Sequence, residues 1–381
     1  MIHRLLSKTV QKRLKEFPCV AIFGPRQSGK TTLAGTLSSL YFDLEQSEDQ
    51  LRLDLSWDSI VASKKLVILD EAQNMPSIFP KIRHAVDANR KQNGRFLILG
   101  SIAPSLMKNV SESLAGRLAI CELSPILLCE MPGSPSVDAL WLRGGFPDGG
   151  LFKPKRFPEW QKDYLTLLAQ RDLPNWGLQA PPQTTWRLFK MLAASHGQLW
   201  NASTIAASLG LSYHTVNRYV DYLQNTYLVT LLAPYHANIH KRLTKSPKIY
   251  WNDSGLLHFL QGAATRERLL SQPWVGASWE GWVLSQILGT LKASGEIFEA
   301  YFFRTSDGYE IDLVLEFSKG RWAFEFKLAG SPGPNDFGRL DYSANLIKAD
   351  KKILVSRTNK TAENKHCISA NIYSCLELLR R

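Results

Sequence analysis

Short apolar runs alternate with amphipathic segments over residues 17–125. The runs read CVAIFG, YFDLE, LVILDE, RFLILGS and AICELSP. A continuous apolar run suits a strand that is covered on both faces, and strands separated by helices are typical of a parallel α/β sheet. The pattern therefore predicts five buried parallel strands with helices between them.

The pattern changes after residue 125. Pro and Gly punctuate residues 125–185 around one helical stretch, EWQKDYLTLLAQRDL, which indicates a hinge or lid region. Residues 184–235 have helical periodicity in three pieces and lead into a short strand pair, LVTLLAPY and KIYWND. A last segment combines the helix SWEGWVLSQILGTL with the strands EAYFFRT, EIDLVLEF and RWAFEFKL and a closing αβ unit. We predict four regions, with boundaries at 1–130, 131–183, 184–255 and 256–381.

The composition is that of a folded protein with more than one domain. The chain has 381 residues, of which 44% are hydrophobic and 21% charged, and this balance excludes a disordered, collagenous or coiled-coil chain. Lys and Arg exceed Asp and Glu by 46 − 34, a formal net charge of +12. Such a surplus attracts polyanions such as nucleic acid, although many basic proteins are enzymes with no such partner.

Cysteine usage and hydropathy bear on where the protein works. The five cysteines form no CxxC pair and have no His at a ligand spacing, which argues against a zinc site or a disulfide framework. The first residues, MIHRLLSKTVQKRLKEF, are basic and amphipathic, and no apolar stretch approaches the length that crosses a bilayer. We expect a cytoplasmic protein with reduced thiols and no membrane partner.

The run GPRQSGKT matches the phosphate-loop pattern GxxxxGK[ST] between the strand CVAIF and the helix TTLAGTLSS. Its glycines let successive backbone N–H groups face the phosphates, Lys30 reaches the β- and γ-phosphates, and the Thr31 hydroxyl binds Mg²⁺. A glycine-rich turn without a ligand is the alternative, and the strand–loop–helix context disfavours it. The predicted nucleotide-binding residues are Gly24, Pro25, Arg26, Gln27, Ser28, Gly29, Lys30, Thr31 and Thr32.

A second motif, the acidic pair Asp70-Glu71, follows the apolar run LVIL. Asp70, at the end of this strand, is placed to hold Mg²⁺, and Glu71 is placed to polarise the attacking water. Together with the phosphate loop, this pair predicts hydrolysis of ATP. Ser101 ends the strand RFLILG, where it has two interpretations: a sensor of the γ-phosphate or a hydroxyl that caps the next helix.

These motifs resemble a known family. GPRQSGKT, FDLE, VILDEAQ, FLILGS, SESLAGR and RGGFP, in this order, are similar to the prokaryotic AAA+-related ATPases that carry a carboxy-terminal domain long described as of unknown function. The resemblance extends over KSPKIYWNDSGLL, SWEGWVLSQIL and GYEIDLVLEF, so it covers almost the whole chain. It implies an α/β fold with an AAA+-type five-stranded sheet, in which an extra strand lies between the two nucleotide motifs.

The resemblance also implies a homo-oligomer, such as a hexameric ring, in which a neighbouring subunit supplies an arginine to the nucleotide. Arg117 in SESLAGR is the candidate for this arginine finger, and a salt-bridged surface arginine is the equal alternative. RGGFP, from Arg143 to Pro147, resembles a nucleotide-contacting element of signalling ATPases. A tight turn that needs no ligand explains it as well.

Residues 203–225 have the helix-turn-helix spacing, with a turn at Gly210 and strands behind it that would form a wing. The second helix has an apolar face of Val216, Tyr219, Val220 and Leu223. No acidic residue occurs from Tyr222 to Asn252, which favours phosphate contact. A nucleotide lid or a protein-docking module is the alternative. The candidate DNA-binding residues are Tyr213, His214, Asn217, Arg218, Lys241, Arg242, Lys245 and Lys248.

Acidic residues gather in the last segment. Asp312 lies in one predicted strand, and Glu325 and Lys327 share a face of the next strand because alternate side chains point the same way. With Glu280 from the preceding helix, and with Glu310 as a further candidate, they could hold Mg²⁺ or Mn²⁺ for attack on a phosphodiester. The order resembles the restriction-endonuclease-like fold, whose members can keep the fold while losing cleavage.

Three hypotheses follow. The first is an ATP-hydrolysing, Mg²⁺-dependent enzyme that couples its nucleotide state to DNA processing or remodelling, with or without metal-dependent cleavage. The second is a signalling switch in which ATP controls assembly and the winged helix binds a protein. The third is a DNA-binding regulator with a decayed nuclease fold.

Overall fold

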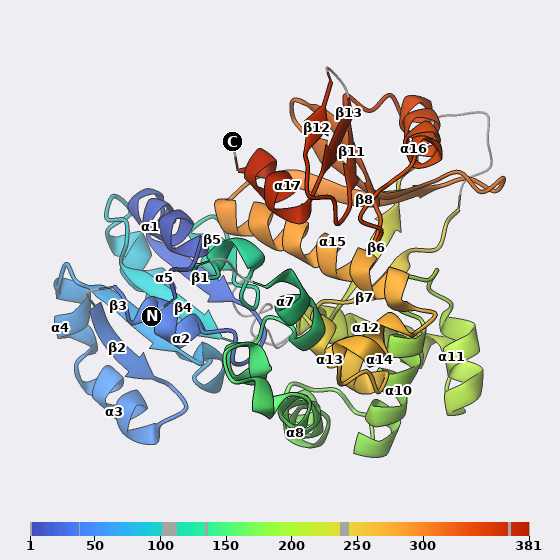
Figure 1. Ribbon diagram of the computed structural model, residues 1–381. Helices are drawn as coiled ribbons and strands as arrows, with labels where there is room; N and C mark the ends of the chain where they lie inside the picture. The colour runs from blue at the N-terminus through green and yellow to red at the C-terminus, as the bar shows by residue number, and fades with distance from the viewer. Residues whose placement is uncertain are drawn as a thin grey trace.

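In the computed structural model of the chain, the amino-terminal region is built around a five-stranded parallel sheet (Figure 1). The structure describes residues 2–37, 39–100, 113–133, 136–236, 244–364 and 367–380. The strands are β1 (Cys19–Phe23), β2 (Ser39–Asp43), β3 (Leu66–Asp70), β4 (Phe96–Gly100) and β5 (Leu118–Glu122), in the order β2-β3-β4-β1-β5. The predicted five-stranded parallel sheet is therefore confirmed, and β4 lies between the strands that carry the two nucleotide motifs.

Helices cover both faces of this sheet. Cys19, Ala21 and Phe23 of β1 pack toward α3 (Ser47–Leu55), α4 (Trp57–Ala62) and α5 (Ile78–Ala88). Val20 and Ile22 pack on the opposite side, toward α1 (Leu6–Glu16) and α2 (Lys30–Ala34). Because both faces are buried, the strands are apolar throughout rather than alternating.

A helical region follows the sheet. It consists of α7 (Val137–Arg143), α8 (Glu159–Leu167), α9 (Leu173–Asn175), α10 (Pro182–Ala194), α11 (Ala202–Leu209), α12 (Tyr213–Asn225), α13 (Ser254–Leu260) and α14 (Arg266–Leu270). The predicted apolar face of α12 is buried, with Val216 and Leu223 fully enclosed. Gly210 ends α11 in the left-handed conformation and Ser212 caps α12, so the turn falls where the spacing predicts it.

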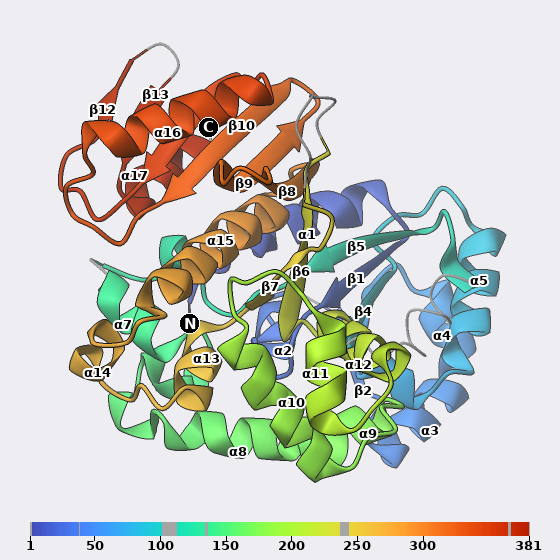
Figure 2. The same cartoon turned by 90° about the vertical axis from the view of Figure 1, so that its right-hand side faces the viewer.

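The strands after α12 join a second, eight-stranded sheet. β6 (Val229–Pro234) and β7 (Lys248–Trp251) form an antiparallel hairpin, and β6 also pairs in parallel with β8 (Phe298–Arg304). The sheet continues through β9 (Glu310–Phe317), β10 (Gly320–Phe326), β11 (Lys351–Val355), β13 (Cys367–Ala370) and β12 (Ala362–Glu363). The hairpin and the carboxy-terminal strands therefore form one sheet (Figure 2).

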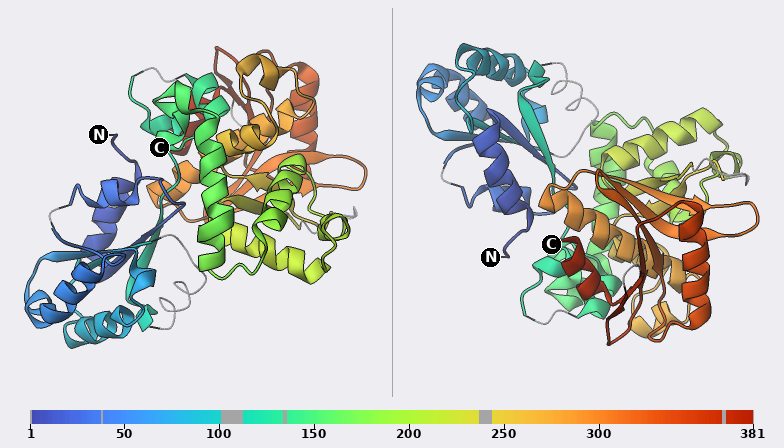
Figure 3. Two further views of the ribbon diagram at one scale, coloured as in Figure 1. Left: turned by 90° about the horizontal axis from the view of Figure 1, so that it is seen from below. Right: turned by 90° about the horizontal axis from the view of Figure 1, so that it is seen from above.

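Three helices cover the carboxy-terminal part of this sheet. α15 (Val275–Ser294) and α17 (Ile372–Leu379) pack on one face against residues such as Phe302 and Leu313. α16 (Pro334–Leu346) packs on the other face. Figure 3 shows the amino-terminal sheet with its helices as one lobe and the rest of the chain as a second. Among the described residues, no helix is long and apolar enough to cross a membrane.

Candidate functional site

The phosphate loop connects β1 to α2 at the carboxyl end of the parallel sheet. Gln27 and Gly29 have positive φ angles of 61° and 95°, which turn the backbone tightly before α2 begins at Lys30. A Cβ atom at Gly24 would lie 2.2 Å from the carbonyl oxygen of Leu123, so this position requires glycine. The predicted loop residues therefore form one continuous turn at a helix amino terminus, where anions bind.

Lys30 lies within this turn. Its Nζ donates hydrogen bonds to the carbonyl oxygens of Gly24 (3.1 Å) and Pro25 (3.0 Å), and the residue is 6% exposed. Burial lowers the pKa of Lys30 to about 8, against the opposing effect of the Glu71 and Asp70 carboxylates. A phosphate that approached the loop would supply the negative charge that favours the ammonium form.

Asp70 ends β3 beside the loop, as predicted. Its Oδ2 accepts hydrogen bonds from the Thr31 hydroxyl at 2.6 Å and from the Tyr41 hydroxyl at 2.9 Å, and its Oδ1 accepts from the backbone N–H of Glu71. The pairing of Thr31 and Asp70 brings together two oxygen donors of the kind that Mg²⁺ prefers. The Ser28 hydroxyl, fully buried in the loop, has no hydrogen-bond partner among the residues that the structure describes. The residues present therefore fit a Mg²⁺-nucleotide.

Glu71 follows Asp70 in the left-handed conformation, with φ 49°. This conformation ends the strand and turns the chain at Glu71. The Gln73 side-chain amide donates a hydrogen bond to Glu71 Oε2. Tyr41 was absent from the sequence prediction. Only the pairing of β2 with β3 brings its hydroxyl to Asp70, so no motif in the sequence identifies it.

A cavity of about 590 Å³ lies beside the phosphate loop. Ser28, Gly29 and Thr32 line it from the loop and α2, and Pro147 and Phe152 line it from the helical region. The amino-terminal residues Ile2, His3 and Arg4 form part of the same wall. Pro147 of the RGGFP motif is therefore brought next to the predicted nucleotide site.

Arg117 lies at the other end of the sheet. Its backbone carbonyl accepts from the N–H of Cys19, the first residue of β1, whereas the phosphate loop follows the last residue. Its guanidinium makes two hydrogen bonds of 2.9 Å to Asp87, which lower the pKa of that carboxyl. Arg117 therefore cannot reach the phosphate loop of its own chain. Ser101 lies outside the described residues.

A cluster of charges joins the phosphate loop to the helical region. Asp172 is 5% exposed, and its Oδ1 accepts from Nη1 of Arg26 at 2.7 Å and from Nε of Arg171 at 2.9 Å. Arg26 belongs to the loop, whereas Asp172 precedes α9 and adjoins residues packed in the core of α10, α11 and α12. Sequence reasoning missed Asp172, which lies 146 residues from Arg26.

The candidate DNA-binding residues differ in how far they are exposed to solvent. Tyr213 on α12 is 51% exposed, and His214, Arg218 and Lys245 are exposed as well. Asn217 is half-buried, and its Oδ1 accepts from the indole N–H of Trp200 at 3.0 Å, so it holds α12 in place. Lys241 and Arg242 lie outside the described residues.

Lys248 differs from the prediction. It is 3% exposed, and its Nζ lies 2.9 Å from Glu280 Oε1 and 2.6 Å from Glu310 Oε1. These carboxylates outweigh the cost of burial and raise the pKa of Lys248 above its ordinary value. Lys248 is therefore an internal cation of the second lobe and not part of an exposed basic surface.

Of the predicted metal-binding carboxylates, Glu280 and Glu310 pair with this lysine and Asp312 lies within electrostatic range of it. Burial, with the Glu280 and Glu325 carboxylates, raises the pKa of Asp312, whose Oδ2 accepts from the N–H of Phe326 at 2.8 Å. Burial also raises the pKa of Glu325, although the ion pair with Lys327 at 2.7 Å opposes that rise.

The arrangement of these carboxylates differs from a metal site. Among the described residues, no three His, Cys, Asp or Glu side chains are placed to hold a metal ion. The expected ligand set of Glu280, Asp312 and Glu325 is therefore not arranged as a metal site, and the ammonium of Lys248 pairs with the Glu280 carboxylate. The sequence signal missed this because Lys248 comes from the hairpin.

Three family models match the chain, and one of them covers the phosphate loop. Residues 16–131 match the model of an AAA domain, residues 134–267 that of a domain of unknown function (DUF8612), and residues 275–375 that of a domain of unknown function (DUF4143). A Walker-type ATPase of Pyrococcus abyssi is similar over 67% of this chain and 94% of that chain, with 14% identity and a TM-score of 0.47.

Two relatives are similar to this chain over most of their length. Uncharacterized proteins of Mycobacterium bovis and Mycobacterium tuberculosis are each 39% identical to this chain over 328 residues, which cover 85% of this chain and 73% of each relative. The chain therefore belongs to the same family as these two mycobacterial proteins, and its amino-terminal region is an AAA-type ATPase domain.

Proposed function

We propose that the chain hydrolyses Mg²⁺-ATP at the phosphate loop and that the nucleotide state controls a DNA-binding surface on α12. The observation that carries the first part is the 2.6 Å contact between Thr31 and Asp70, beside Lys30. The hydroxyl comes from α2 and the carboxylate from the end of β3, and both lie close to the Lys30 ammonium, which supports a hydrolytic site there.

Each residue of this site has a role. Lys30 and the loop N–H groups bind the phosphates and neutralise the charge that develops on them. Thr31 and Asp70 would hold Mg²⁺, which supplies charge neutralisation when bound. Glu71 orients the attacking water. We assign Arg117 to the active site of a neighbouring subunit, which would draw it from its ion pair with Asp87, and an oligomer such as a ring is part of the proposal.

Exposure and charge support the DNA-binding part. Tyr213, His214 and Arg218 are exposed on α12, and Lys245 is exposed just before β7. A phenol ring, an imidazole and a guanidinium on one helix suit contact with bases and phosphates. The interpretation of α11, α12 and the hairpin as a winged helix belongs to this proposal.

The contact between Arg26 and Asp172 supports the coupling. Arg26 is in the phosphate loop, and Asp172 adjoins Leu168, Ala169 and Leu173, which share a core with α10, α11 and α12. A change in the loop on nucleotide binding would act on this ion pair and thereby on the position of the helices.

Cleavage of DNA is not included in the proposal. The order α15, β8, β9, β10, α16, β11 suits a restriction-endonuclease-like domain, but Lys248 pairs with the Glu280 carboxylate that a catalytic metal would need. We propose a structural role for this domain and no Mg²⁺ or Mn²⁺ site in it.

The test is the ATPase rate of the full chain with and without duplex, forked and single-stranded DNA. The proposal expects turnover that depends on Mg²⁺, is stimulated by at least one of these DNAs and is lost in Lys30→Ala. Turnover that persists in Lys30→Ala would reject the assigned site. A rate that none of the DNAs changes would reject the coupling and favour the rival function, an ATP-controlled assembly switch that binds a protein.

A further inference from the structure

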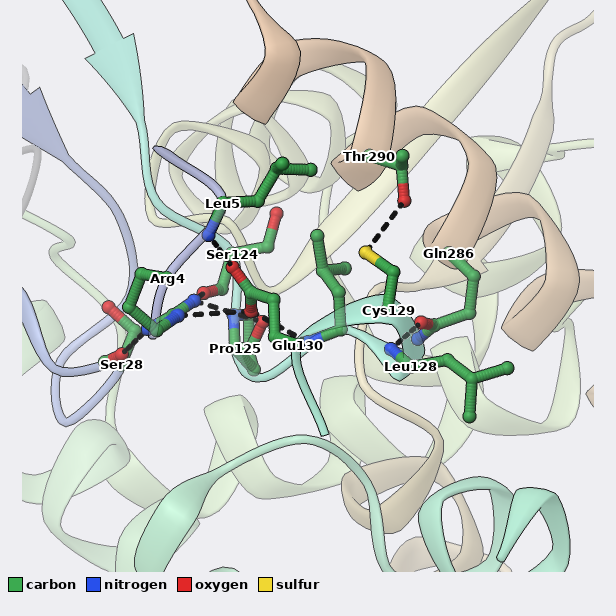
Figure 4. Close-up of polar contacts among 11 residues, drawn as sticks. Arg4, Leu5, Ser28, Ser124, Pro125, Leu128, Cys129, Glu130, Gln286 and Thr290 are labelled. Carbon is green, nitrogen blue, oxygen red and sulfur yellow. Dashed lines mark hydrogen bonds and ion pairs between the residues drawn. The ribbon is translucent and has the colours of Figure 1, made fainter. Parts of the chain in front are cut away.

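We propose that Arg4 is a positioning residue that holds the phosphate loop in its binding conformation through a buried ion pair with Glu130. Arg4 is 6% exposed and precedes α1, far from the loop in the sequence. Its Nη1 donates to the carbonyl oxygen of Ser28 at 2.7 Å, and its Nε contacts Glu130 Oε2 at 3.0 Å. Figure 4 shows the guanidinium between the loop and the Glu130 carboxylate.

The contact with Ser28 acts on the part of the loop that binds phosphate. Ser28 precedes Gly29 and Lys30, and a Cβ atom built on Gly29 would lie 3.5 Å from Arg4 Nη1. When the carbonyl of a peptide unit is held on one side, its N–H partner must point to the other side because the peptide is planar. Arg4 therefore fixes which way the N–H group of Gly29 points.

The same guanidinium also binds the segment that follows β5. Its Nη2 donates to the carbonyl oxygens of Ser124 at 2.5 Å and Pro125 at 3.4 Å, just beyond β5. The planar group thus spans the phosphate loop and the chain after β5, which a lysine with a single ammonium could not do at once. This bridging makes Arg4 a positioning residue, since it acts through the backbone of the loop.

Glu130 is itself held in place. Its Oε1 accepts from the N–H of Leu5 at 2.7 Å, and its Oε2 accepts from the N–H of Leu127 at 3.0 Å. Next to this contact, the backbone N–H of Leu128 donates to the side-chain oxygen Oε1 of Gln286, on α15, at 2.7 Å. These backbone donors and the Arg4 cation compensate the burial of the carboxylate, so losing either charge would leave the other buried without its partner.

The inference rests on ATP binding at the phosphate loop, as proposed above. The test uses the full chain with Arg4→Met, Arg4→Lys and Glu130→Gln, and measures kcat, the KM for Mg²⁺-ATP and thermal unfolding. Arg13→Met is the matched control, because Arg13 lies on the adjoining α1 in a half-exposed pair with Glu16. We expect Arg4→Met to raise the KM about tenfold or more, Glu130→Gln and Arg4→Lys to raise it less, and Arg13→Met to leave it unchanged.

Each outcome decides the inference. A merely structural role would lower the unfolding temperature and leave the KM of the folded protein unchanged, and that result in Arg4→Met would overturn the proposal. If Arg4→Met does not fold, Arg4→Lys decides: a raised KM in folded protein supports the proposal, and an unchanged KM overturns it. Loss of turnover in Lys30→Ala with a normal KM in Arg4→Met rejects this inference alone. Turnover that survives Lys30→Ala instead rejects the assigned ATPase site.

Discussion

At the scale of single residues, the Asp70 carboxylate is the group on which the hydrolytic site depends. Thr31 and Tyr41 donate to the same oxygen, Oδ2, from two different elements. A metal ligand must be held in one orientation to be effective, and residues that hydrogen-bond to ligands supply that orientation. The Tyr41 hydroxyl would therefore keep Asp70 in its orientation when Thr31 and Asp70 hold Mg²⁺.

We predict that Tyr41→Phe lowers kcat about fivefold, because one hydrogen bond to a charged group is lost while the ring is kept. The measurement is steady-state ATP hydrolysis at saturating Mg²⁺. Tyr301→Phe is the matched control, since the Tyr301 hydroxyl donates to the exposed Glu299 at 2.7 Å on β8. An equal kcat in Tyr41→Phe and the wild type would show that Asp70 keeps its orientation without the Tyr41 hydroxyl.

At this scale, the sequence predicts the parts of the site that are contiguous. Lys30, Thr31 and Asp70 lie in short motifs, and each lies where it was expected. Arg4, Tyr41 and Asp172 could not be found in the same way. Their partners lie 126, 29 and 146 residues away, so only the folded chain brings them together.

At the scale of elements, β7 places a lysine among carboxylates. In the sequence, Lys248 belongs to a basic, acid-free segment, and its charge indicated an exposed surface. Burial of a strand residue is set by the sheet to which the strand pairs, and the pairing of the hairpin with β8 is a long-range property. The apolar pattern of α12, by contrast, is local, and its buried face was predicted correctly.

We predict that Lys248→Met lowers the free energy of unfolding by about 3–5 kcal/mol near neutral pH, because the largely buried Glu280 loses its cation and the buried Asp312 loses the positive charge near it. The folded-state pKa of Asp312 and Glu325 is raised above the unfolded value. Protonation of these two carboxyls as the pH falls therefore favours the folded state, and the loss should be smaller at about pH 5 than at about pH 8.

Urea unfolding at both pH values measures this effect, and the exposed Lys245→Met is the control. A second variant, Lys248→Met with Glu280→Gln, should recover part of the stability, because it removes one of the unpaired charges. Equal losses at the two pH values would contradict the explanation by unpaired carboxylates.

A separate prediction concerns the exposed residues of α12 and of the segment just before β7. Changing Arg218 and Lys245 together to Ala should weaken DNA binding about tenfold at ~0.1 M salt and reduce the slope of log affinity against log salt by about 2, because two phosphate contacts are lost. Titration with fluorescent duplex DNA at several salt concentrations measures both. Lys64 and Lys65, which are exposed before β3, provide the control pair. If both double variants bind alike, α12 is not the DNA surface.

At the scale of the whole molecule, the two lobes meet at the Arg26–Asp172 pair and along α15, which contacts both α1 and β5. The first of these contacts ends in the phosphate loop, so it is the one that nucleotide binding would disturb. Asp172 is buried and paired with two arginines, which makes it the centre of this connection.

We predict that Asp172→Asn reduces the stimulation of ATP hydrolysis by DNA toward a ratio of one, while the basal rate changes less. The amide keeps an acceptor for Arg26 but removes the charge that holds both arginines. Rates with and without DNA provide the ratio. Asp148→Asn is the control, because Asp148 pairs with Arg156 at an exposed position. Full stimulation in Asp172→Asn would place the connection between the lobes elsewhere.

The sheet shared by the hairpin and the carboxy-terminal strands has a consequence for the ancestry of the chain. Since β6 pairs with β8, a gene exchange that separated residue 234 from residue 298 would leave β8 paired with β9 alone and create a bare edge that invites aggregation. A recombination that preserves this sheet must therefore carry the hairpin and the carboxy-terminal strands together.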